Sequence, residues 1–367
     1  MERAAKLGPP HEAQQADEGL RMQLARYAPV WVYLARRIGI YVFTVWGAIT
    51  LAFGVFRLMP GDPMTTLMGQ LRVRYEQMNP DPEEVERTIK AYKAMLGLDQ
   101  PLHIQYVRFL RNMFLRGFDT GPSLLAFPKS ARDLILQRLP WTIGYFTSSV
   151  LIAWVLGTLM GTLLGWLRRH RLATVAVALA SLLTSTPSYL LGIVAIIVIA
   201  YQLKWLPPGM PYAPGMTLSW DPEVIKSILR HAILPVSSMV LVIGASFTLG
   251  MRMLMISVLG EDYLAHAKAK GLKPQTILRD YAFRNALLPQ VTALGISLGF
   301  SLNGAVIIEA IFLLPGLGGL FVQAMGTRDF NLMQGIILLS IMAVLTLGLL
   351  VDLILPWLDP RIRRTSV

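Results

Sequence analysis

The stretch that decides the fold is 261–289, which begins EDYLAHAKAKGL (residues 261–272) and ends RNALLP (residues 284–289). It is polar and basic, and it lies between two long apolar runs. Connections between neighbouring helices usually need about 2–8 residues, so this stretch is far longer than a simple turn requires. Its small residues, Ala265, Ala267, Ala269 and Gly271, leave the backbone open to close approach by another chain. We therefore expect a docking surface on a membrane protein.

The composition points to a membrane. The chain has 367 residues, of which 54% are hydrophobic and 15% charged, and its mean hydropathy is +0.51. Soluble domains usually contain about 25% charged residues. Several runs of roughly 20 residues are almost free of charge, and each is long enough to cross a ~30 Å hydrocarbon core as a helix. We predict an all-α membrane protein, because lipid cannot satisfy the backbone groups of open structures.

Six membrane-spanning helices are expected, at residues 38–58, 143–167, 173–203, 233–256, 291–314 and 335–358. Pro187 lies inside the third and longest run, where proline removes a backbone hydrogen bond, so a kink or break is expected there. A large helical segment at 59–140 separates the first two spans. The docking loop, at 257–289, separates the fourth and fifth.

Basic residues orient these spans, since cytoplasmic connections of membrane proteins are rich in Lys and Arg. Most basic residues in the short connections fall on one side: Arg168, Arg169, Arg171, Arg252, Lys268, Lys270, Lys273, Arg279, Arg284, Arg361, Arg363 and Arg364. The other side has Lys204, Lys226, Arg230 and Arg328. The first side is predicted to be cytoplasmic, together with both termini. This pattern explains the net charge of +12 without nucleic acid, for which no binding module is present in the sequence.

The segment before the first span is polar. Residues 1–32 are expected to be a cytoplasmic extension, disordered except for a short amphipathic helix around 20–27, ahead of a transmembrane domain at 33–367. The first apolar run is too long for a cleaved signal and is expected to remain as the first span.

Three helices are expected in the extracytoplasmic segment 59–140. The first covers about 81–97. The second runs from Pro101 to Gly117, with an apolar face made of Ile104, Val107, Leu110 and Phe114. A capping box of Ser130 and Asp133 begins the third. We expect a small cap on the transmembrane helices, the alternative being helices that lie on the membrane surface.

Several kinds of chemistry are missing from the sequence. It has no phosphate-binding G-x-x-x-x-G-K-[ST] loop, no H-E-x-x-H helix and no cysteine. The five histidines offer no metal-ligand pair at helical spacing, so no catalytic, cofactor or metal site is expected. Few ionisable residues lie within or near the spans. The acidic Glu309 is expected to pair with a basic residue or a helix end, and a role in gating is the alternative.

A transport path would need polar groups inside the apolar runs. Candidates are Ser185, Ser188 and Tyr189 in the third run, Ser297, Ser301 and Asn303 in the fifth, and Glu309 near its end. Such groups can line a water-filled cavity. They can equally hydrogen-bond neighbouring helices, and this packing interpretation is the favoured one.

The residues around the docking loop resemble a known family. AKAKGL (267–272) with RNALLP (284–289) is similar to the cytoplasmic EAA loop of ABC importer permeases, in particular the peptide/nickel branch. Further segments resemble the same branch: RLMPGDP (57–63), LGLDQP (96–101), EAIFLLPGLG (309–318) and DPRIR (359–363). The resemblance runs from about residue 33 to residue 364. Residues 1–32 have no counterpart in it, and 121–129 diverge from the usual glycine-rich sequence.

This resemblance implies a permease subunit in a bacterial or archaeal cell membrane. Its implied partners are a second homologous permease, two ATPase subunits that carry ATP and Mg, and an extracytoplasmic binding protein. The coupling helix would be at about 263–270, with Glu261 and Asp262 at its positive end, Lys268 and Lys270 at its negative end, and Gly271 as its stop. The ATPase-coupling residues would be Glu261, Asp262, Tyr263, Ala265, Ala267, Lys268, Ala269, Lys270, Gly271 and Leu272.

The substrate is less closely defined. Short peptides lead, with oligosaccharides and then nickel as alternatives within the same machinery. An ion-coupled secondary carrier is the alternative of a different class. It would need an internal inverted repeat or buried charge relays, and neither is evident in the sequence.

Overall fold

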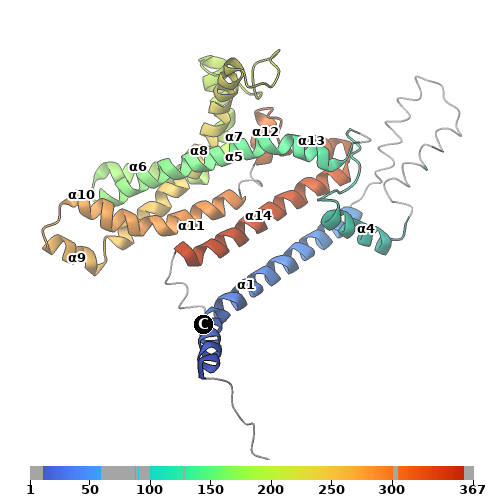
Figure 1. Cartoon of the computed structure of the whole chain (residues 1–367). Helices are drawn as coiled ribbons and strands as arrows, with labels where there is room; N and C mark the ends of the chain where they lie inside the picture. Colours follow the sequence, from blue (N-terminus) through green and yellow to red (C-terminus); the bar gives the residue numbers. More distant parts are fainter. Residues whose placement is uncertain are drawn as a thin grey trace, which may run out of the picture.

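The computed structural model in Figure 1 describes residues 11–58, 87, 90, 100–126, 129–300 and 305–358. Within these ranges every regular element is a helix, apart from one isolated bridge between Pro122 and Ser130. The helices are α1 (His11–Leu58), α4 (Leu102–Leu115), α5 (Ala131–Trp166), α6 (Arg171–Ser185), α7 (Ser188–Ala195), η1 (Ile196–Gln202), α8 (Pro222–Val258), α9 (Asp262–Ala269), α10 (Pro274–Thr276), η2 (Ile277–Phe283), α11 (Arg284–Phe300), α12 (Ala305–Ile311), α13 (Leu317–Thr327) and α14 (Phe330–Leu358).

Four of the described helices are long and apolar enough to cross a membrane: Leu34–Leu58 within α1, α5, α8, and Phe330–Leu350 within α14. A fifth candidate is the bent pair Arg171–Ser185 and Ser188–Gln202, whose two parts meet at 98°. The bend falls at Pro187, which confirms the predicted break. The structure therefore supports a multi-pass helical membrane protein with four or five candidate spans in the described residues.

The predicted fifth span is described in two parts, α11 to Phe300 and α12 over Ala305–Ile311, and residues 301–304 between them lie outside the described part of the chain. Its continuity therefore stays a prediction. The predicted end at residue 314 is wrong, because Leu313 has a φ of 52° and the helix has already stopped at Ile311. Pro315 follows two residues later, and a proline disfavours helical geometry in the residue before it.

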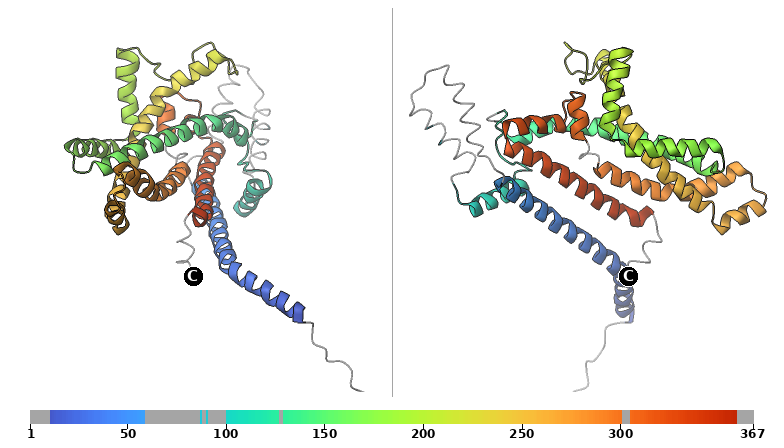
Figure 2. Two further views of the ribbon diagram at one scale, coloured as in Figure 1. Left: turned by 60° about the vertical axis from the view of Figure 1, so that its left-hand side comes forward. Right: turned by 180° about the vertical axis from the view of Figure 1, so that it is seen from behind.

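The predicted disorder of the N-terminal extension is contradicted from His11 onward, since α1 runs from there into the first span. Residues 12–27 are rich in Ala, Glu, Gln, Leu and Arg, which are strong helix formers. Residues 1–10 lie outside the described chain. In Figure 2 α14 runs alongside α1, and the two helices are in contact.

The predicted third helix of segment 59–140 is not separate. It is the beginning of α5, which continues through Pro140 into the second span. Ala131 and Ile135 are buried against α13 and α14, and this packing holds the first turns in place. The capping box is absent from the structure, because Ser130 Oγ instead donates to Asp119 Oδ1 at 3.2 Å.

The helix α4 begins after Pro101 and ends before Gly117, as predicted, with a φ of 66° at that glycine. The predicted apolar face is not the one that packs, apart from Leu110: Val107 is 63% exposed and Phe114 58%. Phe109 and Met113 are buried instead, in a cluster with Val45, Ile49, Ala52 and Leu338 of α1 and α14. α4 thus caps two transmembrane helices, which is the favoured prediction. The helix predicted at 81–97 lies outside the described ranges except for residues 87 and 90.

Three glycines let α5 and α8 approach closely. A Cβ atom at Gly157 would lie 2.5 Å from the Gly244 carbonyl oxygen, and one at Gly165 would lie 2.5 Å from Met255 Cβ. Between them, a Cβ at Gly161 would lie 2.7 Å from Met251 Cβ and would clash with the Thr248 carbonyl oxygen. This spacing of small residues, four apart, brings helix backbones together in membranes, where dispersion contacts replace the hydrophobic effect.

Candidate functional site

The predicted docking helix is present as α9, which covers Asp262–Ala269 and lies beyond the ends of α8 and α11 (Figure 1). Glu261 is its first, extended residue, Asp262 lies in its first turn, and Lys268 lies in its last turn. These charges oppose the helix dipole at both ends. Gly271 has a φ of 73°, the left-handed conformation that ends a helix. The local signals in the sequence are therefore sufficient to define this helix.

One face of α9 packs into the loop's own core. Leu264 and Ala267 are buried, together with Met251 and Met255 of α8, Ile277 and Ala282 of η2, and Ala286 of α11. The half-buried Leu272 also packs against this cluster. Because the cluster ties α9 to the ends of two long helices, a force on α9 would be transmitted directly to α8 and α11.

The opposite face of α9 is exposed. It presents Tyr263, Ala265, Lys268 and Ala269, and the exposed surface continues into Glu261 and Asp262 before them and Lys270 and Gly271 after them. Tyr263 is held by Asn285, whose Nδ2 donates to its hydroxyl at 3.1 Å. Of the small residues predicted to meet a partner, Ala265, Ala269 and Gly271 are available, whereas Ala267 is 4% exposed and serves the core. A pattern of alternating alanines does not show which of them face inward.

The surroundings of α9 are basic. A cavity of about 770 Å³ separates Lys268 from the segment 166–170 and is lined by Arg168, Arg169 and His170 as well. On η2, Arg279 Nε donates to Asp280 Oδ1 at 2.8 Å, and this hydrogen bond lowers the pKa of the Asp280 carboxyl. That carboxylate is thus ionised at neutral pH, and the net charge of the loop remains positive.

A second feature is an apolar cavity of about 520 Å³ between α5, α7, α8 and α11. Two of the predicted path residues, Ser188 and Ser297, line it together. Its other lining residues are Phe146, Val150, Met239, Val242, Ile243, Ser246, Phe247, Gly250, Gln290 and Ala293. A largely apolar wall with a few hydroxyl and amide groups suits a ligand that is recognised loosely.

Sequence reasoning missed Ser246 and Gln290 in this cavity. Gln290 is 2% exposed, and its Nε2 donates to the Phe247 carbonyl oxygen at 3.0 Å. Both are isolated polar residues within or next to apolar runs, and that signal could have selected them. The remaining lining is apolar and carries no local sign of a path.

Other predicted path residues do not join the cavity. Ser185 is exposed, and its Oγ donates to the Ser181 carbonyl oxygen at 3.1 Å within its own helix. Tyr189 packs against the buried cluster that contains Phe146 and Phe312. Ser301 and Asn303 lie outside the described residues. Ser185 therefore joins neither the cavity nor a neighbouring helix, whereas Tyr189 packs against other helices.

Glu309 forms a buried anchor rather than part of the cavity wall. It is 1% exposed, Thr142 Oγ1 donates to its Oε1 at 2.6 Å, and the Gly318 N–H donates to its Oε2 at 2.6 Å. Thr142 Oγ1 in turn accepts the Leu317 N–H at 2.8 Å. The carboxylate thus sits at the N-terminus of α13, which is the helix-end pairing expected from the sequence. A Cβ at Gly316 would overlap this carboxylate, so the turn requires glycine.

Metal chemistry finds no support in the described residues, among which no group of three His, Asp or Glu side chains could hold an ion. The arrangement that remains is a helical membrane bundle with an apolar cavity and a basic, projecting helix.

These features agree with the comparisons to known proteins. Residues 137–364 match the family described as the binding-protein-dependent transport system inner membrane component. The match covers more than half of the chain, and the chain belongs to this family. It is therefore an integral-membrane permease of an ABC importer, a transport component, and the family membership does not favour the ion-coupled carrier.

Curated relatives extend the similarity over almost the whole chain. A putative peptide transport system permease protein of Brucella abortus is 35% identical over 316 residues, which are 85% of this chain and 93% of that protein. The di/tripeptide transport system permease protein DppB of Pseudomonas aeruginosa is 32% identical over 355 residues, or 90% and 98% of the two chains. The oligopeptide transport system permease protein AppB of Bacillus subtilis is 30% identical over 332 residues, again 90% and 98%.

Proposed function

We propose that this chain forms half of the translocation path of an ABC importer for short peptides. The observation that carries the proposal is its similarity, over 85% or more of its length, to permeases whose names specify peptides. The apolar cavity agrees, because a wall with few polar groups can accept varied side chains. Nothing in the described residues favours nickel or oligosaccharides over peptides.

In this proposal the chain has six spans, with both termini in the cytoplasm of a bacterial or archaeal cell. A second permease completes the path, two ATPase subunits bind ATP and Mg, and an extracytoplasmic binding protein delivers the peptide. The exposed face of α9 docks on an ATPase. Its buried face, through Leu264 and Ala267, carries the ATPase movement to α8 and α11 as a rigid-body motion.

The assembly is tested by gentle affinity purification of the full-length chain from native membranes. The expected companions are a second permease and ATPases with phosphate-binding loops, and reconstitution with them should give ATP-dependent uptake of a labelled tripeptide. A chain that purifies alone, and stimulates no ATPase when candidate subunits are returned, would contradict the proposal.

The coupling role makes a specific prediction for the exposed alanines. Ala265→Asp or Ala269→Asp should reduce ATP-driven uptake at least about tenfold, since a carboxylate buried without a partner at an interface is unfavourable. Membrane abundance should stay unchanged, because neither residue touches the loop core. Ala269→Ser is the matched control and should transport normally. Wild-type uptake by both Asp variants would remove α9 from the coupling step.

Gly271→Asp should also impair docking, whereas Ala267→Asp should act differently. Because Ala267 lies inside the loop core, a charge there should unfold the loop itself and lower the amount of membrane protein.

The cavity can be tested with single cysteines, since the chain contains none of its own. Ser188→Cys, Ser246→Cys and Ser297→Cys should react with a water-soluble maleimide, and the peptide with its binding protein should slow the reaction. Ser149→Cys is the control, because Ser149 is fully buried on α5. Its labelling should be at least about tenfold slower, as expected for a site without solvent access. Equal labelling of all four positions would argue against a solvated path through this cavity.

A further inference from the structure

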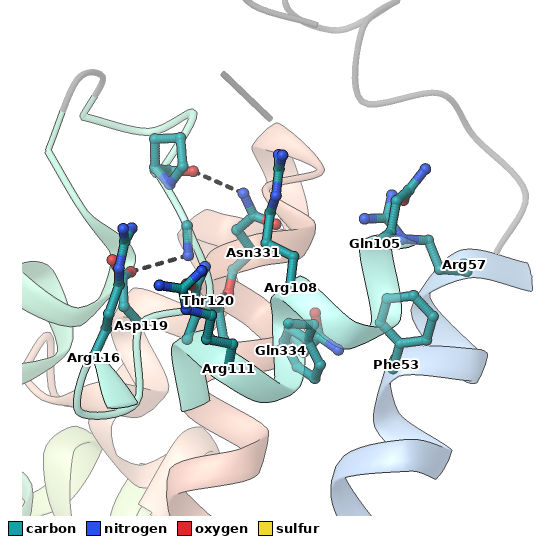
Figure 3. A pocket seen from close by; sticks show the side chains of 14 residues that line it. Phe53, Arg57, Gln105, Arg108, Arg111, Arg116, Asp119, Thr120, Asn331 and Gln334 are labelled. Carbon is teal, nitrogen blue, oxygen red and sulfur yellow. Dashed lines mark hydrogen bonds between the residues drawn. The ribbon is translucent and has the colours of Figure 1, made fainter. Parts of the chain in front are cut away.

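A third pocket, of about 440 Å³, lies at the end of the molecule opposite α9. Its walls come from the end of α1, from α4, from the loop 116–122 and from the start of α14 (Figure 3). It shares no lining residue with the 520 Å³ cavity and none with α9.

The pocket is strongly basic. Four arginines line it, Arg57, Arg108, Arg111 and Arg116, against a single acidic residue, Asp119. That carboxylate is already used, because Asp119 Oδ1 accepts the Gly121 N–H at 3.0 Å and Ser130 Oγ at 3.2 Å. Within the described residues no carboxylate forms an ion pair with any of the four guanidinium groups. The positive charge is therefore available to a ligand.

A buried donor also lines the pocket. Gln334 is 6% exposed, and in the described part of the chain its Nε2 has no hydrogen-bond partner. Its neighbour Asn331 is satisfied, since Asn331 Nδ2 donates to the Pro122 carbonyl oxygen at 2.9 Å (Figure 3). Buried amide groups rarely remain unpaired in folded proteins. Gln105 Oε1 is also buried without a partner in this wall and is an acceptor. The four arginines and Gln334 Nε2 are donors and outnumber it, so the group that matches the pocket is an oxyanion.

The position of the pocket identifies the source of that oxyanion. Arg57 lies at the end of the apolar stretch Leu34–Leu58, and Gln334 lies in the second turn of the stretch that begins at Phe330. The pocket is thus at the level where the hydrocarbon ends and lipid headgroups begin. Beside it, α4 exposes Val107, Phe114 and Leu115, which would contact acyl chains. The guanidinium group of Arg57, stacked 5.4 Å from the Phe53 ring centroid, is held at this boundary.

We propose that this pocket binds the phosphate group of an anionic phospholipid. Guanidinium groups form paired hydrogen bonds with phosphate oxygens, and Gln334 Nε2 can donate to a further oxygen. The lipid would join α1, α4 and α14, whose residues line the pocket together at this end of the bundle.

The test uses the full-length chain in detergent, titrated with phosphatidylglycerol, phosphatidylcholine or inorganic phosphate, and followed by native mass spectrometry and thermal unfolding. Phosphatidylglycerol should bind saturably and raise Tm. The double variant Arg108→Gln/Arg111→Gln, at two exposed positions, should weaken this binding at least about tenfold, as expected when charge-assisted bonds to phosphate are removed. Lys226→Gln/Arg230→Gln changes the net charge equally, lies outside the pocket and should bind normally.

Gln334→Leu separates binding from folding. It removes a buried unpaired donor, so the lipid-free variant should be at least as stable as the wild type while its Tm rises less with phosphatidylglycerol. Unchanged lipid affinity in the Arg108/Arg111 double variant would overturn the proposal, and so would binding of inorganic phosphate with no preference for the lipid. A third contradicting result would be a double variant that loses docking of the binding protein while its lipid binding stays normal. The last would assign the pocket to acidic residues of a protein partner.

Discussion

Replacing Gly161 by leucine should eliminate the folded protein from the membrane. A single Cβ at this position already lies 2.7 Å from Met251 Cβ and clashes with the Thr248 carbonyl oxygen. Neither neighbour can rotate away, since one is a backbone atom and the other is fixed to the backbone. α5 and α8 would have to separate along their whole contact. Overpacking a core with movable side chains costs about 1–3 kcal/mol. A clash with rigid atoms should cost more, against a total stability of roughly 5–15 kcal/mol.

The matched control lies on the same helix. Gly144 has no described atom within 4 Å of its Cβ position, so Gly144→Leu should fold normally. Gly161→Ala should fall between the two, because it introduces the clash without the additional methyl groups. Membrane abundance, the size-exclusion profile in detergent and Tm would measure the series. If Gly161→Leu and Gly144→Leu gave equal amounts of monodisperse protein, the close α5–α8 contact would be wrong.

The sequence predicts the elements of this fold better than their contacts. Hydropathy and length locate α1, α5, α8 and α14, and Pro187 marks the 98° bend, because these are local properties of the chain. The spacing of Gly157, Gly161 and Gly165 is present in the sequence, but a spacing alone does not identify the helix that approaches. On α4 the two possible apolar faces are similar in the sequence. The positions of α1 and α14 decide that Phe109 and Met113 are the buried residues.

At the candidate site, too, the sequence predicts the helix better than the contacts that the helix makes. The α9 helix follows from its capping and charge pattern, and its bounds agree with the prediction within one residue at each end. Which alanine faces inward depends on Met251 and Ile277, which come from other elements, so Ala267 was misplaced. In the cavity, Ser188 and Ser297 were predicted. Gln290 was not, because a lone amide after a proline resembles the end of a loop.

The second large effect is expected at Glu309, whose carboxylate joins three elements. It accepts from Thr142 of α5 and from the Gly318 N–H at the start of α13, while it belongs to α12. Glu309→Leu would leave both donors buried without an acceptor, at about 1–3 kcal/mol each. The helix dipole of α13 would also lose its counter-charge. We therefore expect Glu309→Leu to lower Tm strongly and to abolish uptake together with the fold.

Glu309→Gln should give an intermediate result, since its single carbonyl oxygen can accept from one donor while its NH₂ group faces the other. Glu223→Gln is the matched control: Glu223 also lies in the first turn of a helix, α8, but is exposed, so its loss should leave Tm and uptake unchanged. A gating role predicts another outcome, in which Glu309→Gln keeps the wild-type Tm and loses uptake. Measuring Tm and uptake on the same preparations therefore distinguishes an anchor from a gate, and the three hydrogen bonds that join Thr142, Leu317, Gly318 and Glu309 favour the anchor.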